Sequence, residues 1–145
     1  MTFYADTSFL FSYYATDANS ARADLWRQAH AEPLPFTVLH RLELRNAFER
    51  AVFQGRITAN EASELWTQID SDLNAGLLIE AALSLPDLFR EGEALAHQHT
   101  AQTGARSLDI LHVAAARLLT SDELVTFDVR QMSLANLIGL RVAQP

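Results

Sequence analysis

The sequence alternates short apolar segments with longer stretches of helical periodicity, and this alternation constrains the fold more than any other feature. The apolar segments are the expected strands, which lie at Thr2 to Ala5, Phe36 to Val38, Leu77 to Ile79, Glu123 to Phe127 and, at an edge, Leu140 to Val142. Short strands separated by helices favour parallel pairing through right-handed crossovers. The sequence therefore predicts an α/β domain with parallel strands.

Residues that start and stop helices divide the rest of the chain. Thr58 and Glu61 have the spacing of a capping box, and Gly55 and Gly104 stand where helical patterns stop. One helix is expected directly after Asp6, and the others at 18–31, 39–54, 58–72, 86–103, 107–119 and 128–137. With 145 residues and no repeat or linker, residues 1–145 are expected to form one domain.

Four acidic residues stand where apolar segments end or turn. Asp6 follows the first strand, Asp128 follows the fourth, Asp109 begins an alanine-rich helix, and Glu43 lies in the helix after the second strand. A lone carboxylate is costly to bury because its charge loses hydration. Sites in open α/β sheets form beyond the carboxyl ends of the strands, so the four could meet there. Mg²⁺ or Mn²⁺ would neutralise such a cluster, which points to phosphate chemistry.

Each of these acids also has a local interpretation. Asp6 and Asp128 both precede helices and could be N-caps. Asp109 could interact favourably with a helix dipole from the first turn. Glu43 could pair with Arg41 or Arg45, or face water. The order and context of the four acids carry more information than any one of them.

Composition narrows the classes of protein. The chain has no cysteine, which excludes disulfides and thiolate metal sites and fits a reducing compartment such as the cytoplasm. We expect no signal peptide and no membrane-spanning segment. The net charge of −7 is unlike that of a general nucleic-acid coat protein, although every basic residue is an arginine, the side chain that binds phosphate with two parallel hydrogen bonds. Genome base composition is the simpler explanation of the missing lysines.

These motifs resemble those of PIN-domain proteins, in particular the toxins of VapBC-type toxin–antitoxin pairs. The resemblance covers essentially the whole chain, and it depends on the segments Tyr4-Ala5-Asp6-Thr7-Ser8, Arg41-Leu-Glu-Leu-Arg-Asn46, Ser107-Leu-Asp-Ile-Leu-His112 and Thr126-Phe-Asp128. It implies a three-layer α/β/α fold with a central parallel sheet of four to five short strands. It also implies a ribonuclease that uses Mg²⁺ or Mn²⁺, a homodimer, and a cognate antitoxin protein that blocks the site. The RNA substrate, whether tRNA, ribosomal RNA or mRNA, stays open.

In that scheme Asp6, Glu43 and Asp109 would hold a first ion directly or through water, and Asp128 would complete the cluster. Whether one ion or two bind stays open. The hydroxyl groups that adjoin the acids would orient the carboxylates, with simple helix capping as the alternative; they belong to Thr7, Ser8 and Thr126.

Other polar residues near the acids have weaker cases. Arg106, Arg45 and Asn46 could bind substrate, although a solvated surface position is the simpler interpretation of each. His112 lies one helical turn after Asp109 and could contact substrate or orient a carboxylate, but we favour a satisfied core or surface histidine. The aromatic residues of the first helix would support a homodimer if exposed and could equally be core; they are Phe9, Phe11, Tyr13 and Tyr14.

Three other functions fit parts of the pattern. A catalytically silent PIN-like module that binds RNA or protein is the main alternative, and the presence of all four acids weighs against it. A receiver-type phospho-acceptor domain resembles a chain with a late lysine, which this chain lacks. A phosphatase of the haloacid-dehalogenase type would require Asp-x-Asp after the first strand, where this chain has Ser8.

Overall fold

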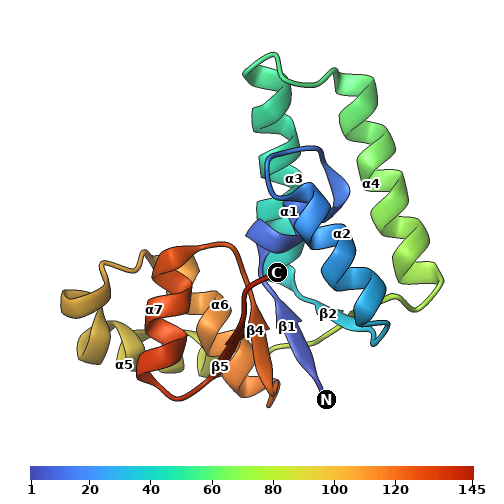
Figure 1. Ribbon diagram of the computed structural model, residues 1–145. Coiled ribbons are helices and arrows are strands. Elements are labelled where there is room, and N and C mark those ends of the chain that lie inside the picture. Colours follow the sequence, from blue (N-terminus) through green and yellow to red (C-terminus); the bar gives the residue numbers. More distant parts are fainter.

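A computed structural model describes all 145 residues and contains seven helices and five short strands (Figure 1). The strands are β1 (Phe3–Ala5), β2 (Leu34–Phe36), β3 (Leu78–Glu80), β4 (Glu123–Val125) and β5 (Arg141–Ala143). The helices are α1 (Thr7–Tyr14), α2 (Ser20–Ala29), α3 (Val38–Phe53), α4 (Ala59–Asn74), α5 (Leu85–Thr103), α6 (Ser107–Leu118) and α7 (Val129–Leu137).

All strand pairs are parallel, as expected for the α/β class, but they form two ladders. One ladder has the order β1–β4–β5, with Tyr4 opposite Leu124, and the other joins β2 to β3. β1 and β2 lie next to each other without ladder hydrogen bonds. Leu34 N–H and Phe36 C=O both bond to the β3 side, so Pro35 faces the other way. Since proline has no N–H to donate, the sheet is interrupted there.

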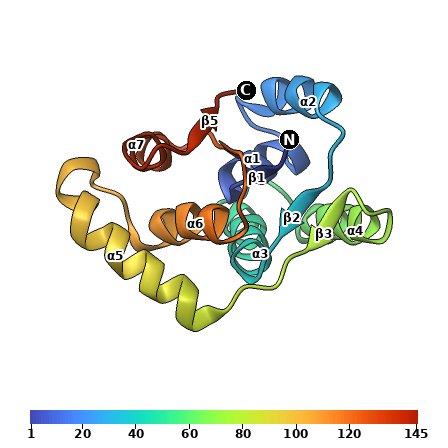
Figure 2. The ribbon, with the colours of Figure 1, turned by 90° about the horizontal axis from the view of Figure 1, so that it is seen from below.

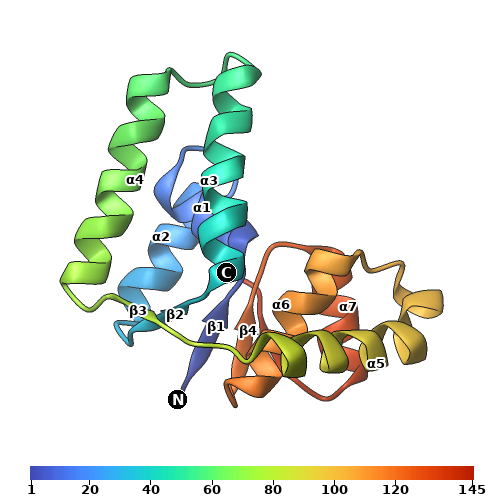
Figure 3. The same ribbon diagram turned by 180° about the vertical axis from the view of Figure 1, so that it is seen from behind.

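The helices form two layers on opposite faces of β1 and β4 (Figure 2). Helices α5, α6 and α7 lie on one face, and α1 to α4 lie on the other. Side chains alternate between these layers along β1, because Tyr4 belongs to the core under α5–α7 whereas Phe3 and Ala5 belong to the core under α1–α4. The expected three-layer α/β/α arrangement is therefore confirmed. Helices α3 and α4 form a hairpin that projects beyond the sheet (Figure 3).

A buried histidine fixes the start of α3 against the end of β1. His40 Nε2 donates to the Ala5 carbonyl at 2.8 Å, and its Nδ1 accepts from Thr37 N–H at 2.9 Å. Complete burial and the nearby charge of His112 lower the pKa of His40 to about 3, so the ring is neutral. His40 thus provides a hydrogen bond for the Ala5 carbonyl at the end of β1, and Glu43 lies one turn further along α3.

Two strands differ from expectation by two residues, and the other three differ by one. The second strand ends at Phe36, because Thr37 caps α3 and Val38 already begins the helix. The fourth strand ends at Val125, because the next residue turns and the Thr126 hydroxyl accepts from Asp128 N–H at 2.9 Å. In both cases β-branched or aromatic residues gave a strand-like pattern, and a side-chain hydrogen bond at the helix start overrides it.

The aromatic residues of α1 are core rather than surface. Phe9 is fully buried against Trp26 and Phe127, while Phe11, Tyr13 and Tyr14 are partly buried and pack on the same core. They supply no exposed face for a homodimer. None of the helices has both the length and the apolar character that crossing a bilayer would demand.

We predict that His40→Gln weakens the dependence of stability on acid pH. The unfolded histidine binds a proton with an ordinary pKa of about 6.5, while the folded one does not until about pH 3. The unfolded state therefore holds more protons in between, and the free energy of unfolding falls on acidification by up to about 1.4 kcal/mol per pH unit from this group. The glutamine side chain of the variant cannot titrate but can still donate to Ala5.

Urea unfolding between about pH 6 and pH 4.5 measures these slopes. His97→Gln, at an exposed position of α5, is the matched control and should retain the slope of the unsubstituted protein. Equal slopes in His40→Gln and the unsubstituted protein would contradict the assignment of a neutral His40.

Candidate functional site

The four acids predicted to form a site line one open pocket of about 420 Å³, which we call the acidic pocket. Asp6 follows β1 and caps α1, and Asp128 follows the neighbouring strand β4 and caps α7. Asp109 lies in the first turn of α6, and Glu43 lies in the second turn of α3. The site thus lies at the carboxyl ends of β1 and β4, as expected for a parallel sheet.

Asp6 is 1% exposed and uses one oxygen for the protein. Its Oδ1 accepts from Phe9 N–H at 3.0 Å and from the Ser8 hydroxyl at 2.7 Å, whereas its buried Oδ2 has no partner. Burial raises the pKa of Asp6, and this effect exceeds the opposing influence of His112 and of the hydrogen bonds. The N-cap role expected for Asp6 is therefore real, but it leaves a buried oxygen unsatisfied.

Glu43 pairs with neither of the arginines considered for it. Arg41 bonds to Glu80, and Arg45 stacks over the Trp66 ring with its Cζ 3.8 Å from the ring centroid. Glu43 Oε1 instead forms a hydrogen bond with His112 Nε2 and accepts from the Thr7 hydroxyl at 3.1 Å.

Partial burial would raise the pKa of Glu43, but several neighbours oppose that effect. The hydrogen bond and charge of His112 act with the Thr7 hydroxyl and the charge of Arg106 to hold the pKa below its usual value. Glu43 is therefore ionised at neutral pH.

Asp109 and Asp128 each contact backbone at a helix start. Asp109 Oδ2 accepts from Arg106 N–H at 3.0 Å and lies 3.5 Å from Arg106 Nε. Asp128 Oδ1 accepts from the backbone N–H groups of Arg130 at 2.9 Å and Gln131 at 3.0 Å. Both acids therefore interact with the start of a helix, as their local interpretations predicted. Each uses only one carboxylate oxygen for these hydrogen bonds.

The three hydroxyl groups expected to orient the acids lie close to them. Thr7 bonds to Glu43 and Ser8 bonds to Asp6. Thr126 is fully buried, and its hydroxyl lies 3.3 Å from the Ser8 hydroxyl and accepts from Asp128 N–H. These contacts connect the loop after β4 to the start of α1.

The donor set suits a hard divalent cation. The second oxygens of Asp6, Glu43 and Asp128 accept no hydrogen bond from the protein, and the second oxygen of Asp109 has only a 3.5 Å contact with Gln131 Nε2. Free carboxylate oxygens are the ligands that Mg²⁺ and Mn²⁺ prefer. As the side chains stand, no group of three acidic or histidine residues could hold one ion, so binding would require them to draw together.

Sequence reasoning missed two polar residues of this pocket. Gln131 is 4% exposed, and its Oε1 is a second buried oxygen without a partner. Asp17 accepts from the N–H of Asn19 at 2.8 Å, and it also lines the pocket. Only the fold brings α7 and the loop after α1 to the acids, so no local pattern could have identified either residue.

A second pocket of about 490 Å³, the arginine pocket, continues from the acidic pocket along α3. The two share Glu43, Arg106 and Asp109, and the arginine pocket adds Asn46 and Arg50. Of the predicted substrate-binding residues, Arg106 and Asn46 line it, while Arg45 lies over Trp66 and lines neither pocket. Arg50 was not singled out from the sequence, although it lies seven residues after Glu43 and so on the same helix face.

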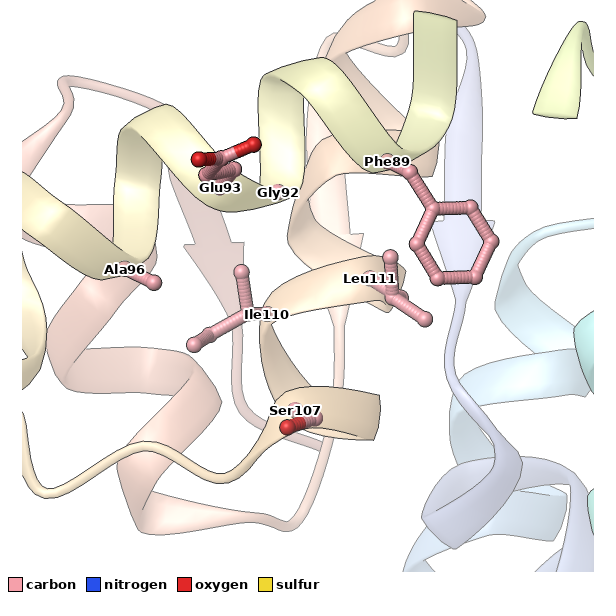
Figure 4. Close-up of a pocket in the computed structure, with 7 residues that line it drawn as sticks. All are labelled: Phe89, Gly92, Glu93, Ala96, Ser107, Ile110 and Leu111. Carbon is pink, nitrogen blue, oxygen red and sulfur yellow. The ribbon is translucent and has the colours of Figure 1, made fainter. Parts of the chain in front are cut away.

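A third, apolar pocket of about 270 Å³ lies between α5 and α6 (Figure 4). Phe89 and Ala96 of α5 face Ile110 and Leu111 of α6 there. Gly92 allows the helices to approach, because a Cβ at this position would lie 3.1 Å from Leu111 Cδ2. None of the four acids lines this pocket.

We predict that Asp6→Asn stabilises the metal-free protein at pH 7. Because burial raises the pKa of Asp6, its stabilising contribution is present at low pH and is lost as pH rises through the folded pKa. Asparagine retains the N-cap but carries no charge. A change of about 1 kcal/mol would raise Tm by roughly 4 °C in EDTA, and the difference should shrink towards about pH 4. Asp24→Asn, on the exposed side of α2, is the control, and a lower Tm for Asp6→Asn would contradict the prediction.

No protein-family model matches the sequence, and no curated protein matches it. Solved structures match the fold. VapC20 of Mycobacterium tuberculosis, a toxin that cleaves the sarcin-ricin loop, is 14% identical, with a TM-score of 0.74 over 99% of this chain and 100% of that one. FitAcB from Neisseria gonorrhoeae is 16% identical, with a TM-score of 0.69 over 99% and 97% of the two chains. The chain therefore has the PIN fold that the sequence resemblance predicted.

Proposed function

We propose that the protein is a metal-dependent endoribonuclease and the toxin of a type II toxin–antitoxin pair. The observation that carries the proposal is the acidic pocket, in which four carboxylates from four separate segments each keep an oxygen available. A sequence-distant protein of the same fold, VapC20, is an RNA-cleaving toxin, which supports this choice of substrate over other phosphate esters.

Each residue has a definite task in this mechanism. Asp6, Glu43 and Asp109 would hold a Mg²⁺ or Mn²⁺ ion through their available oxygens, and Asp128 would complete the cluster for that ion or a second one. When bound, such an ion acidifies water for attack on phosphorus and stabilises the charge that develops on the phosphate oxygens. Ser8 and Thr7 keep the Asp6 and Glu43 carboxylates in orientation through their hydrogen bonds.

The arginine pocket would bind the RNA backbone beside the acids. Arg106 and Arg50 provide guanidinium groups that can bind a phosphate with two hydrogen bonds, and Asn46 provides an amide one turn before Arg50 on α3. Single-stranded RNA fits an open groove of this kind because its backbone is accessible and its bases can be splayed apart. The two guanidinium groups would provide local phosphate contacts in a chain whose net charge is −7.

As a toxin, the protein would require a cognate antitoxin that covers the acidic pocket, and we propose a homodimer as its assembly. The exposed apolar side chains that could support these contacts lie outside α1 and include Val38, Leu42, Phe53, Ile79, Leu85 and Phe89. Phe53, at the end of the projecting α3, is 92% exposed.

A catalytically silent RNA-binding module is the alternative function. The open arrangement of the acids favours it, because no three of them are placed to hold one ion without movement. The two functions differ in whether RNA is cut, and both predict RNA binding in the arginine pocket.

We predict that the purified protein cuts cellular RNA at discrete positions with Mn²⁺ or Mg²⁺, and that EDTA abolishes the cuts. Asp6→Asn should lower the rate more than about 100-fold, because a lost ligand costs more than the 10–100-fold typical of its supporting partners. Gel analysis of total RNA measures the cuts, and Asp24→Asn serves as the control. Binding without cutting, in any metal, would favour the silent module.

We also predict that Arg50→Gln weakens RNA binding without altering the site chemistry. Removing one phosphate contact should raise KM, leave kcat unchanged, and lower the slope of log affinity against log salt by about 0.7. Arg90→Gln, on the exposed side of α5, removes an equal charge away from the groove. If both variants behaved alike, the arginine pocket would not be the RNA-binding surface.

A further inference from the structure

We infer that His112 is a positioning residue for Glu43, held in place by Tyr4, so that one oxygen of Glu43 stays available in the acidic pocket. The inference rests on the proposed function, because it assigns to His112 the task of preparing a metal ligand. His112 is 1% exposed and lies on α6 one turn after Asp109, whereas Glu43 approaches it from α3.

The contacts form a chain across three elements. Tyr4 of β1 is fully buried, and its hydroxyl lies 2.8 Å from His112 Nδ1. His112 Nε2 lies on the other side of the ring and bonds to Glu43 Oε1. These hydrogen bonds therefore run from the strand that precedes Asp6, through the helix that carries Asp109, to Glu43.

The direction of the last hydrogen bond follows from the chemistry of its partners. An ionised carboxylate can only accept, so Nε2 of His112 carries the proton in this contact. Thr7 donates to the same oxygen at 3.1 Å. Two donors thus converge on Oε1, and Oε2 accepts nothing from the protein. A glutamate side chain has several rotatable bonds, and fixing it before the ion arrives avoids part of the entropy cost of binding.

The other buried histidine shows what a purely structural role looks like here. His40 bonds to two backbone groups, the Thr37 N–H and the Ala5 carbonyl. It therefore satisfies hydrogen-bonding groups of the backbone. His112 is hydrogen-bonded to side chains, and one of them belongs to the acidic pocket. A histidine needed only for packing would not have to bond to an acid of the site.

The test compares two amide substitutions of His112, one that retains the hydrogen bond to Glu43 and one that loses it. His112→Gln can place its amide nitrogen near the former Nε2 and still donate to Glu43. His112→Asn places its amide near the former Nδ1 and retains a partner for Tyr4, but it does not reach Glu43. We expect His112→Asn to weaken Mn²⁺ binding by about tenfold or more in calorimetric titration, and His112→Gln to retain affinity within about threefold. His97→Asn, at an exposed position of α5, is the matched control.

A double-variant cycle with Glu43→Gln isolates the link between the two residues. If His112 acts through Glu43, adding His112→Asn to Glu43→Gln should cause no further loss of Mn²⁺ affinity. Thermal unfolding of each variant in EDTA separates affinity from folding. Tyr4→Phe, which removes only the hydroxyl that holds Nδ1, should lower Mn²⁺ affinity in the same direction by a smaller factor.

The outcomes separate this inference from the proposed function. Equal Mn²⁺ affinities for His112→Asn and His112→Gln, or additive losses in the cycle, would overturn the positioning role and leave the nuclease proposal intact. Failure of the unsubstituted protein to bind Mn²⁺ would overturn both. An affinity loss that tracks the loss of Tm across all variants would show that His112 is structural only.

Discussion

Burying carboxylates at one end of a parallel sheet is the constraint on which the rest of this structure depends. Each charge must be compensated, yet a site for a cation needs oxygens that the protein leaves alone. The protein resolves this by dividing each carboxylate, so that one oxygen caps a helix, meets a hydroxyl or pairs with a histidine. The partners of these oxygens are the N–H groups at helix starts, the neighbouring hydroxyls and the buried His112.

The features that could be predicted from the sequence are those that depend on short segments of the chain. Short segments are enough to recognise the alternation of strands and helices, the capping residues and the four acids. In the structure these segments form an α/β fold, and the four acids line one acidic pocket. The second strand was misplaced by two residues. Phe36-Thr37-Val38 has strand-like composition, but Thr37 is the N-cap of α3 and its N–H donates to the His40 side chain. The interruption of the sheet at Pro35 could not be predicted in this way, because it depends on which strands are neighbours in the fold.

The predictions from residue type were weakest where a side chain has a choice of partners. Arg45 and Arg50 look equivalent in the sequence, but one stacks on Trp66 and the other lines the arginine pocket. His112 and Gln131 find their partners on segments 69 and 22 residues away, and no helical or strand period connects such positions. Residues that act through long-range contacts can be named from sequence only after the fold is known.

The interruption between β1 and β2 has a mechanical consequence for the acids. Glu43 lies on α3, which follows β2 on one side of that seam, whereas Asp6 and Asp128 follow β1 and β4 on the other side. Side chains such as His40 and His112 cross the seam, but no strand-to-strand ladder does. The position of Glu43 relative to the other acids is therefore set by side-chain hydrogen bonds across the seam, and not by the backbone hydrogen bonds of a shared sheet.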